Sequence, residues 1–147
     1  MGVTDPKSVF GTTKNLEKKF GKNRVFDVPA SENALTGFAI GASMSGYYPV
    51  LNHQRLDFAL LSIDQIINSA AKWNYMFGGK QNIPIVIRMI IGRGWGQGPT
   101  HSQNLQSFFA HGCREIEPFL NAICSCVVKV EPFQTPCCGW KYVWGSS

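Results

Sequence analysis

The sequence lacks long apolar runs and has little charge. No apolar stretch approaches the roughly 20 residues that a membrane-spanning helix needs. Hydrophobic residues make up 44% of the 147-residue chain and charged residues only 16%, which excludes a disordered chain, a coiled coil and a collagen-like fibre. The start, MGVTDPKS, shows no basic region followed by an apolar stretch, so we expect no secretory signal peptide and a soluble intracellular domain.

Cysteine is absent before residue 113, and all five cysteines follow in the last 36 residues of the chain. Their spacing, C-x10-C-x-C-x10-C-C, contains no pair of the kind from which tetrahedral zinc sites are built. An odd number of cysteines without an export signal also does not predict a disulfide framework. The cysteines therefore mark a compositional change in the C-terminal part of the chain.

Excess positive charge is confined to the N-terminus. The net charge is +5, and residues 1–24 hold six Lys or Arg and two Asp or Glu, which gives +4. The stretch KNLEKKFGKNR predicts a short solvated helix that ends at Gly21. A nucleic-acid surface would interleave these bases with a series of stacking aromatic residues, whereas KNLEKKFGKNR holds a single one, Phe20. No nucleic-acid-reading motif is present either, so we do not expect a nucleic-acid partner.

Two longer helices are predicted after this segment. Ser31 is a typical N-cap, and the small residues that follow it continue a helix to Gly46. A second helix is expected over residues 55–77, because its apolar residues fall near one side and Gly78-Gly79 would close it. A shorter helix is expected over the segment NLQSFFAH.

Strand patterns alternate with these helices. Residues 26–28 are expected to end a short strand, and residues 48–51 form a brief extended piece. The apolar run at residues 83–87 is rich in β-branched residues, which is typical of a strand covered on both faces. Residues 119–130 are apolar enough to form a strand or a helix. The alternation predicts an α/β fold with a parallel sheet.

Single residues carry weak functional signals on their own. Glu32, in the first turn of a helix, would by itself only complement the helix dipole, and Phe58 would by itself be a core residue. Asp64 and Asn68 share a helix face, as a polar pair that is buried or at an interface. The pattern Gly37-x-x-x-Gly41 would permit close helix packing, within the chain or between subunits.

The loop GRGWGQGPTHSQ follows the apolar strand. It lacks the Gly-Lys-Ser/Thr end of a P-loop and the G-x-G-x-x-G spacing of a dinucleotide fold. It is typical of an exposed loop at the carboxyl end of a strand, where α/β sheets place their sites. His101, at its end, could exchange a proton, although taken alone it indicates a surface histidine.

Three stretches together are more specific than any single motif: FDVPASENALTGFAIGASMSGYYPV, FALLSIDQIINSAAKWNYMFGGKQNIPIVIRM and GPTHSQNLQSFFAH. They resemble the β subunits of thiamine-diphosphate-dependent 2-oxo acid dehydrogenases, the first components of pyruvate, branched-chain and acetoin dehydrogenases. The similar region is their transketolase-like pyrimidine-binding domain and covers residues 5–111. The resemblance implies an α/β fold with a three-layer parallel sheet flanked by helices, here incomplete.

The resemblance also implies site residues. Glu32 matches the glutamate that hydrogen-bonds N1′ of the aminopyrimidine, and Phe58 matches the aromatic residue that packs against this ring. His101 matches a histidine near the substrate carbonyl that donates or orients a proton. Ile85 matches a position whose backbone carbonyl binds a structural potassium ion in some members. Glu32 and His101 would thus be catalytic, and Glu32 and Phe58 would bind the cofactor.

Partners follow from the same resemblance. Thiamine diphosphate would be shared with an α subunit, whose Gly-Asp-Gly motif holds the diphosphate and magnesium; this chain contains no Gly-Asp-Gly. A lipoyl acyltransferase core would be a further partner, the assembly a homodimer or heterotetramer, and the location cytoplasmic or the mitochondrial matrix. We expect the chain to be inactive alone.

The chain departs from the family pattern at both ends. The first strand and helix of the family domain do not precede Met1, and the resemblance stops after His111. We expect residues 1–111 to form the pyrimidine-binding domain, and residues 112–147 to be a divergent Cys- and Trp-rich tail that arises from a frameshifted or truncated reading frame. The alternatives are a transketolase- or deoxyxylulose-phosphate-synthase-like domain, a non-catalytic dimerisation module and, last, a nucleic-acid binder.

Overall fold

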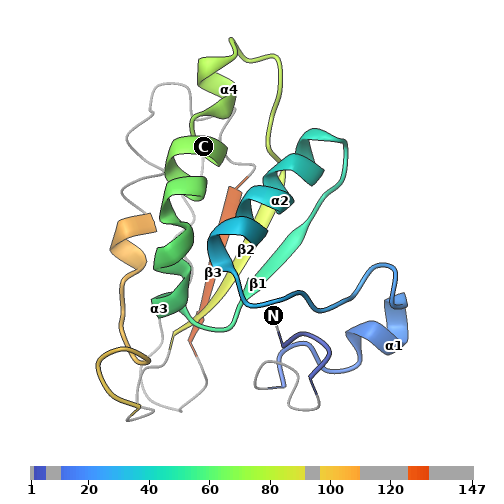
Figure 1. The fold of residues 1–147 in the computed structure, drawn as a ribbon, viewed down its shortest axis with the longest axis vertical. Coiled ribbons are helices and arrows are strands. Elements are labelled where there is room, and N and C mark those ends of the chain that lie inside the picture. The colour runs from blue at the N-terminus through green and yellow to red at the C-terminus, as the bar shows by residue number, and fades with distance from the viewer. Residues whose placement is uncertain (1, 6–10, 92–96, 110–125, 133–147) are drawn as a thin grey trace.

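Three parallel strands form the sheet on which the chain is built (Figure 1). The structure is a computed structural model and describes residues 2–5, 11–91, 97–109 and 126–132. The strands β1 (Val50–His53), β2 (Ile85–Ile91) and β3 (Cys126–Pro132) follow one another in the sheet in this order. Both pairings are parallel, which confirms the predicted α/β class and the direction of the strands.

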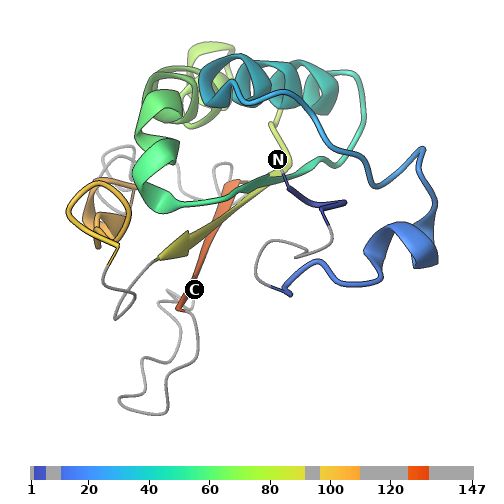
Figure 2. The ribbon, with the colours of Figure 1, turned by 60° about the horizontal axis from the view of Figure 1, so that its bottom comes forward.

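The helices lie over one face of this sheet (Figure 2). They are α2 (Glu32–Met44), α3 (Leu56–Ala59), the 3-10 turn η1 (Leu60–Ser62), the π-helical η2 (Gln65–Ala70) and α4 (Trp73–Met76). The described residues thus build two of the three expected layers, the sheet and one helical layer. Residues 32–91, which hold β1, β2 and these helices, are called the central unit below.

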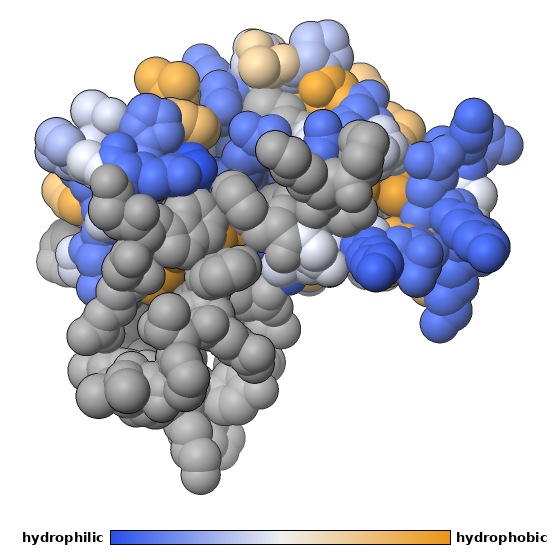
Figure 3. Space-filling view, turned by 90° about the horizontal axis from the view of Figure 1, so that it is seen from below, coloured by the Kyte–Doolittle hydropathy of each residue, from blue (hydrophilic) through white to orange (hydrophobic). Residues whose placement is uncertain are grey.

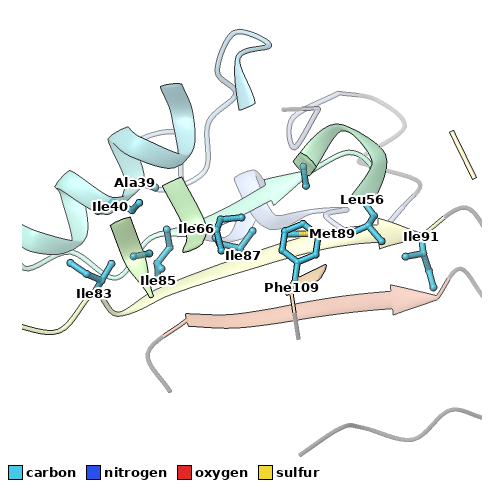
Figure 4. Packing of buried hydrophobic residues seen from close by; sticks show 12 residues of the cluster. Ala39, Ile40, Leu56, Ile66, Ile83, Ile85, Ile87, Met89, Ile91 and Phe109 are labelled. Carbon is cyan, nitrogen blue, oxygen red and sulfur yellow. The ribbon is translucent and has the colours of Figure 1, made fainter. Parts of the chain in front are cut away.

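Apolar side chains of β2 form the centre of the core. Ile85, Ile87 and Met89 have no exposed surface. Figure 4 shows Ile85 and Ile87 beside Ile66 of η2, and Met89 beside Phe109 and Leu56. Burying each such side chain contributes about 1.5–3 kcal/mol. The remaining members of the core cluster are Ala39, Leu56, Ala59, Ala70, Ile83, Ile91 and Phe109.

The opposite face of β2 is covered at Ile90, which is buried, but only partly at Val86 and Arg88. The prediction of a strand covered on both faces is therefore confirmed for the helical face and only in part for the other. Val86 and Arg88 point away from the helices and are half-buried. A charged side chain at the middle of the strand needs a polar partner or water. Nη1 of Arg88 accordingly donates to the backbone oxygen of Thr12 at 3.4 Å.

The long helix expected over residues 55–77 is helical along its length but changes geometry twice, at η1 and η2. The Ser62 hydroxyl donates to the carbonyl oxygen of Ala59 at 2.8 Å, and such local bonds compete with the regular backbone ladder. Gly78 and Gly79 end the helix with φ of 65° and 76°, as predicted, because glycine adopts positive φ without strain.

Residues 11–31, called the N-terminal segment below, lie beside the sheet and carry the positive charge. Their helix α1 (Leu16–Phe20) has no buried residue and ends at Gly21, where φ is 81°. Figure 3 shows hydrophilic residues gathered over this part of the molecule. The prediction of a short solvated helix is therefore confirmed.

The strand expected to end at residues 26–28 is not formed, and that prediction was wrong. Asp27 instead accepts hydrogen bonds from the backbone N–H groups of Val3 and Thr4, at 3.2 and 3.1 Å, and from the Thr4 hydroxyl at 2.9 Å. Partial burial raises the pKa of Asp27, but the hydrogen bonds from Thr4 and Val3 lower it by a larger amount. The pKa of Asp27 therefore lies below its ordinary value. The Asp27 side chain, rather than hydrogen bonds to a neighbouring strand, holds residues 26–28 in place.

The C-terminal stretch is described only in part. Residues 106–109 are helical, within the predicted helix NLQSFFAH, and β3 confirms the strand alternative for the apolar stretch 119–130, which it overlaps. Residues 92–96 of the glycine-rich loop and the rest of 112–147 lie outside the described residues, and the domain boundary and the frameshift stay predictions. No helix in the described part of the chain is long and apolar enough to cross a bilayer.

Candidate functional site

Several polar and aromatic residues meet where β1 ends. His53 is the last residue of β1, and α3 begins three residues later at Leu56. Since β1 and β2 are parallel, their carboxyl ends lie at the same edge of the sheet, which is where open α/β sheets bind ligands. This edge is called the carboxyl edge below.

Phe58 and His101 form a ring contact at the carboxyl edge. Their ring centroids are 5.4 Å apart, and the planes are inclined at 84°, the edge-to-face geometry that aromatic rings favour. Both side chains are partly exposed. The Thr100 hydroxyl lies 2.8 Å from Nδ1 of His101, so Nε2 is the ring nitrogen without a hydrogen-bond partner among the described residues. The structure thus joins two predicted site residues that are 43 positions apart.

Glu32 is the first residue of α2 and is partly buried. Its backbone oxygen accepts a bond from the Thr36 hydroxyl at 2.8 Å, whereas the predicted N-cap, Ser31, makes no side-chain capping bond. Within the described residues, no donor is bonded to the Glu32 carboxylate. A carboxylate at a helix N-terminus is favoured by the helix dipole, so Glu32 is held in a position where it could accept a bond from a ligand.

His53 links the start of α2 to the carboxyl edge. Its imidazole is completely buried, and its Nε2 atom lies 3.5 Å from the Thr36 hydroxyl oxygen. Burial lowers the pKa of His53 from 6.5 to about 4, so the ring is neutral at pH 7. The contact between Thr36 and His53 thus joins the start of α2, where Glu32 lies, to the end of β1. The helix α3, which carries Phe58, follows directly after β1.

Two further residues at the edge were missed from the sequence. Nη1 of Arg55 donates to the backbone oxygen of His101 at 3.2 Å, and Oδ1 of Asp57 accepts from the backbone N–H of Gln103 at 3.1 Å. The available signal was a pair of opposite charges, Arg55 and Asp57, directly between the end of a strand and the aromatic Phe58. The role of this charged pair could not be predicted, because both bonding partners lie 46 residues further along the chain.

The carboxyl edge also holds buried oxygen atoms that no described residue satisfies. They are Oδ2 of Asp57, Oγ of Ser102 and Oε1 of Gln106. Because buried polar atoms are normally hydrogen-bonded, these atoms indicate an edge that is completed by water, a ligand or another chain. Atoms of the same kind also occur away from this edge, at Ser43 on α2 and at Trp73 on α4, so they do not by themselves mark a binding site.

Ile85 does not belong to this edge. It lies at the amino end of β2, fully buried in the core, at the opposite edge of the sheet from the Phe58–His101 pair. Among the described residues, no group of three or more His, Cys, Asp or Glu side chains could hold a metal ion. A backbone potassium site at Ile85 stays a prediction.

The two spacing motifs have separate outcomes. Asn68 donates to Asp64 at 2.7 Å, as their shared face predicts, but both are exposed in this chain, so the buried alternative was wrong. A Cβ on Gly37 would lie 3.3 Å from Oε1 of Gln65, whereas one on Gly41 would meet no described atom within 4 Å. Gly37 therefore serves packing within the chain.

Comparisons with known proteins agree with this geometry. Residues 2–114 match the family described as the pyrimidine binding domain of transketolase. Over 103 residues the chain is 46% identical to the β subunit of acetoin:2,6-dichlorophenolindophenol oxidoreductase from Cupriavidus necator, covering 70% of this chain and 30% of that protein. It is 38% identical over 112 residues to the β subunit of the mitochondrial pyruvate dehydrogenase E1 component from Homo sapiens, covering 75% and 31%.

A plant relative extends the match slightly further. The β-1 subunit of the mitochondrial pyruvate dehydrogenase E1 component from Oryza sativa is 39% identical over 119 residues, which is 80% of this chain and 32% of that protein. The chain thus spans about a third of the length of these curated relatives. On the family match and these identities, the chain belongs to the transketolase pyrimidine-binding domain family, and its relatives there are β subunits of pyruvate and acetoin dehydrogenases.

Proposed function

We propose that this chain supplies the aminopyrimidine side of a thiamine diphosphate site in the β subunit of a 2-oxo acid dehydrogenase. One observation carries the proposal: the Glu32 carboxylate has no partner among the described residues. Glu32 is the first residue of α2, whose Thr36 lies against His53 at the edge that holds Phe58 and His101.

Each residue has a distinct role in this proposal. Glu32 would accept a hydrogen bond from a ring nitrogen of the aminopyrimidine, and the partly exposed Phe58 would contact the flat face of the ring. His101 would orient the substrate or give it a proton through Nε2. When bound, the cofactor supplies the electron sink for decarboxylation of a 2-oxo acid.

The other half of the site would come from a partner chain. The sequence has no Gly-Asp-Gly motif, so we propose that an α subunit holds the diphosphate and magnesium, and that this chain alone turns over no 2-oxo acid. The relatives are named as β subunits, and those from Homo sapiens and Oryza sativa as mitochondrial. A lipoyl acyltransferase core, a homodimer or heterotetramer, and a cytoplasmic or matrix location are parts of the same proposal.

Reconstitution tests the proposal directly. The purified chain is mixed with the α subunit of a matching dehydrogenase, thiamine diphosphate and magnesium, and decarboxylation of pyruvate and branched-chain 2-oxo acids is measured. Glu32→Gln should lower the rate by about 100-fold or more, because proton positioning of this kind contributes roughly 10²–10⁴. Glu17→Gln is the matched control, since Glu17 is also an acid in a first turn but belongs to the solvated α1. Equal activity of the Glu32→Gln and Glu17→Gln mixtures would contradict the assignment.

A non-catalytic dimerisation module is the second candidate. Phe38, on α2, is 71% exposed, and Gly41 on the same helix faces open space in the described structure. If association were the whole function, Glu32→Gln would leave both the oligomeric state and every cellular activity of the chain unchanged. Sedimentation analysis of this variant beside the reconstitution assay separates the two functions.

A further inference from the structure

We propose that Arg55 and Asp57 are positioning residues, which hold the segment 98–103 so that the His101 ring stays against Phe58. Their catalytic consequence rests on the proposed function, whereas their effect on the His101 ring does not. The hydrogen bonds from these two residues go to backbone atoms of the segment and not to the His101 ring. They act through the backbone of the segment.

The two side chains grip the segment on both sides of Ser102. The Arg55 guanidinium bonds the carbonyl oxygen of His101 at 3.2 Å, and the Asp57 carboxylate bonds the N–H of Gln103 at 3.1 Å. The pair therefore fixes the backbone immediately before and after one residue. These two hydrogen bonds thereby set the direction in which the His101 side chain leaves the backbone.

The rest of the segment offers little else to hold His101. Its N–H donates to the backbone oxygen of Gly98 at 3.3 Å, and Gly98 has a φ of 85°, so the segment turns back on itself there. The contact between Thr100 and Nδ1 of His101 is also made within the segment. Within the described part of the chain, two hydrogen bonds and one ring contact join residues 98–103 to the central unit, and they come from Arg55, Asp57 and Phe58.

Burial and charge strengthen the grip. Asp57 is only 7% exposed, so its bond to Gln103 is charge-assisted and shielded from water. Partial burial lowers the pKa of Arg55, and the nearby Asp57 carboxylate opposes that shift. The two opposite charges stand two residues apart at the start of α3, and one bonds a backbone acceptor whereas the other bonds a backbone donor.

Hydrogen exchange and ring shifts in the full chain test this positioning. Asp57→Ala should raise the exchange rate of the Gln103 amide by about tenfold or more, because a bond to a charged acceptor is lost. It should also move the His101 ring-proton resonances toward those of a free histidine, since the ring current of Phe58 would no longer act on them. Asp57→Asn keeps an oxygen acceptor for Gln103. It should return the Gln103 exchange rate to within about threefold of that of the unaltered chain, and the His101 resonances to their positions in that chain.

Asp64→Ala is the matched control, because it removes an exposed carboxylate from the same helical stretch, where it accepts only the bond from Asn68. It should change neither readout. Arg55→Gln tests the second bond independently and covers the case in which Asp57→Ala fails to fold. Unchanged His101 resonances in folded Asp57→Ala and Arg55→Gln chains would overturn the proposal, as would equal effects of Asp64→Ala.

The complex with the α subunit gives the catalytic arm. Asp57→Ala should lower kcat by about tenfold with little change in the KM for thiamine diphosphate, because the misplaced group is His101 and not Glu32. If Glu32→Gln keeps full activity while Asp57→Ala still releases the His101 ring, the proposed function fails and the positioning stands. A loss of activity in Asp57→Ala with His101 still against Phe58 overturns the positioning.

Discussion

The N-terminal segment and the central unit hold their shapes by different interactions. In the central unit, Ile85, Ile87 and Met89 have no exposed surface beneath α2 and η2. In the N-terminal segment the one buried residue is the polar Thr13, whose hydroxyl donates to Val3. The first region is thus stabilised by apolar burial and the second by hydrogen bonds to nearby chain.

This difference locates the function. The proposed site residues Glu32 and Phe58 stand on helices of the central unit, and His101 is attached to it through Arg55 and Asp57. The N-terminal segment contributes no residue to the carboxyl edge in the described structure. A rigid scaffold with a tethered segment at its edge is a common arrangement for binding sites.

The largest effect is expected from an apolar deletion in the core. Ile87→Ala should lower the free energy of unfolding by about 2–5 kcal/mol, because it removes transfer energy and leaves a cavity. Phe20→Ala, in the N-terminal segment, should cost less than about 1 kcal/mol, since that ring is 44% exposed and the Lys19 and Arg24 cations lie over it at 5.2 and 5.9 Å from its centroid. Urea unfolding of both variants measures the contrast, and equal losses would break it.

Acid should weaken the central unit through His53. Its pKa is about 4 in the folded chain against 6.5 ordinarily, so between these values the unfolded chain binds a proton that the folded chain does not. The free energy of unfolding should therefore fall by ~3 kcal/mol from pH 7.5 to pH 4 on account of this residue. Urea unfolding of His53→Gln over the same range should show a shallower decline, and parallel curves would contradict the prediction.

A smaller effect is expected at Asp27. Asp27→Ala removes the acceptor for Val3 and Thr4 and should cost about 1 kcal/mol, because the carboxylate is exposed and screened by water. The pKa of Asp27 is lowered on folding, so its contribution is present above about pH 4 and is lost as the pH falls through the folded value. Amide exchange at Val3 and Thr4 measures the loss; undisturbed amides there would show that other contacts hold the segment.

The smallest effect sharpens the view of α2. Gly41→Ala should stabilise the chain by about 0.5–1 kcal/mol, because alanine favours a helix interior and its Cβ meets no described atom within 4 Å. Thermal unfolding measures this gain. If the same variant instead disrupts self-association in sedimentation experiments, then Gly41 lies in an interface between chains.

Local patterns predicted the regular elements well where they agree with burial. The β-branched run that became part of β2 and the small-residue stretch that became α2 were correctly assigned, because each buries an apolar face, although the expected N-cap Ser31 makes no side-chain capping bond. The segment 26–28 was misassigned, since Asp27 satisfies two backbone donors with its side chain and needs no neighbouring strand. The changes of geometry within residues 55–77 were also not foreseen, because the Ser62 bond to Ala59 is a side-chain effect on the helix.

The candidate site was predicted through family resemblance more than through local chemistry. Taken singly, Glu32, Phe58 and His101 had ordinary structural explanations, and only their order along the chain indicated a shared site. In the structure two of them, Phe58 and His101, make a ring contact, whereas their roles stay predictions. Arg55 and Asp57 could not be assigned, because their partners are backbone atoms, which leave no mark in the residue pattern.

By itself, the sequence determined which stretches are apolar with a helix or strand period, where glycine ends them, and that the charge is concentrated at the start of the chain. These properties depend on neighbouring residues and on water. Only the tertiary structure decided that His53 is buried and neutral, that Ile85 lies at the opposite edge from the Phe58–His101 pair, and that two charged side chains hold the backbone around Ser102. Those properties depend on distances between residues far apart in the chain, which are fixed only when the parallel strands align.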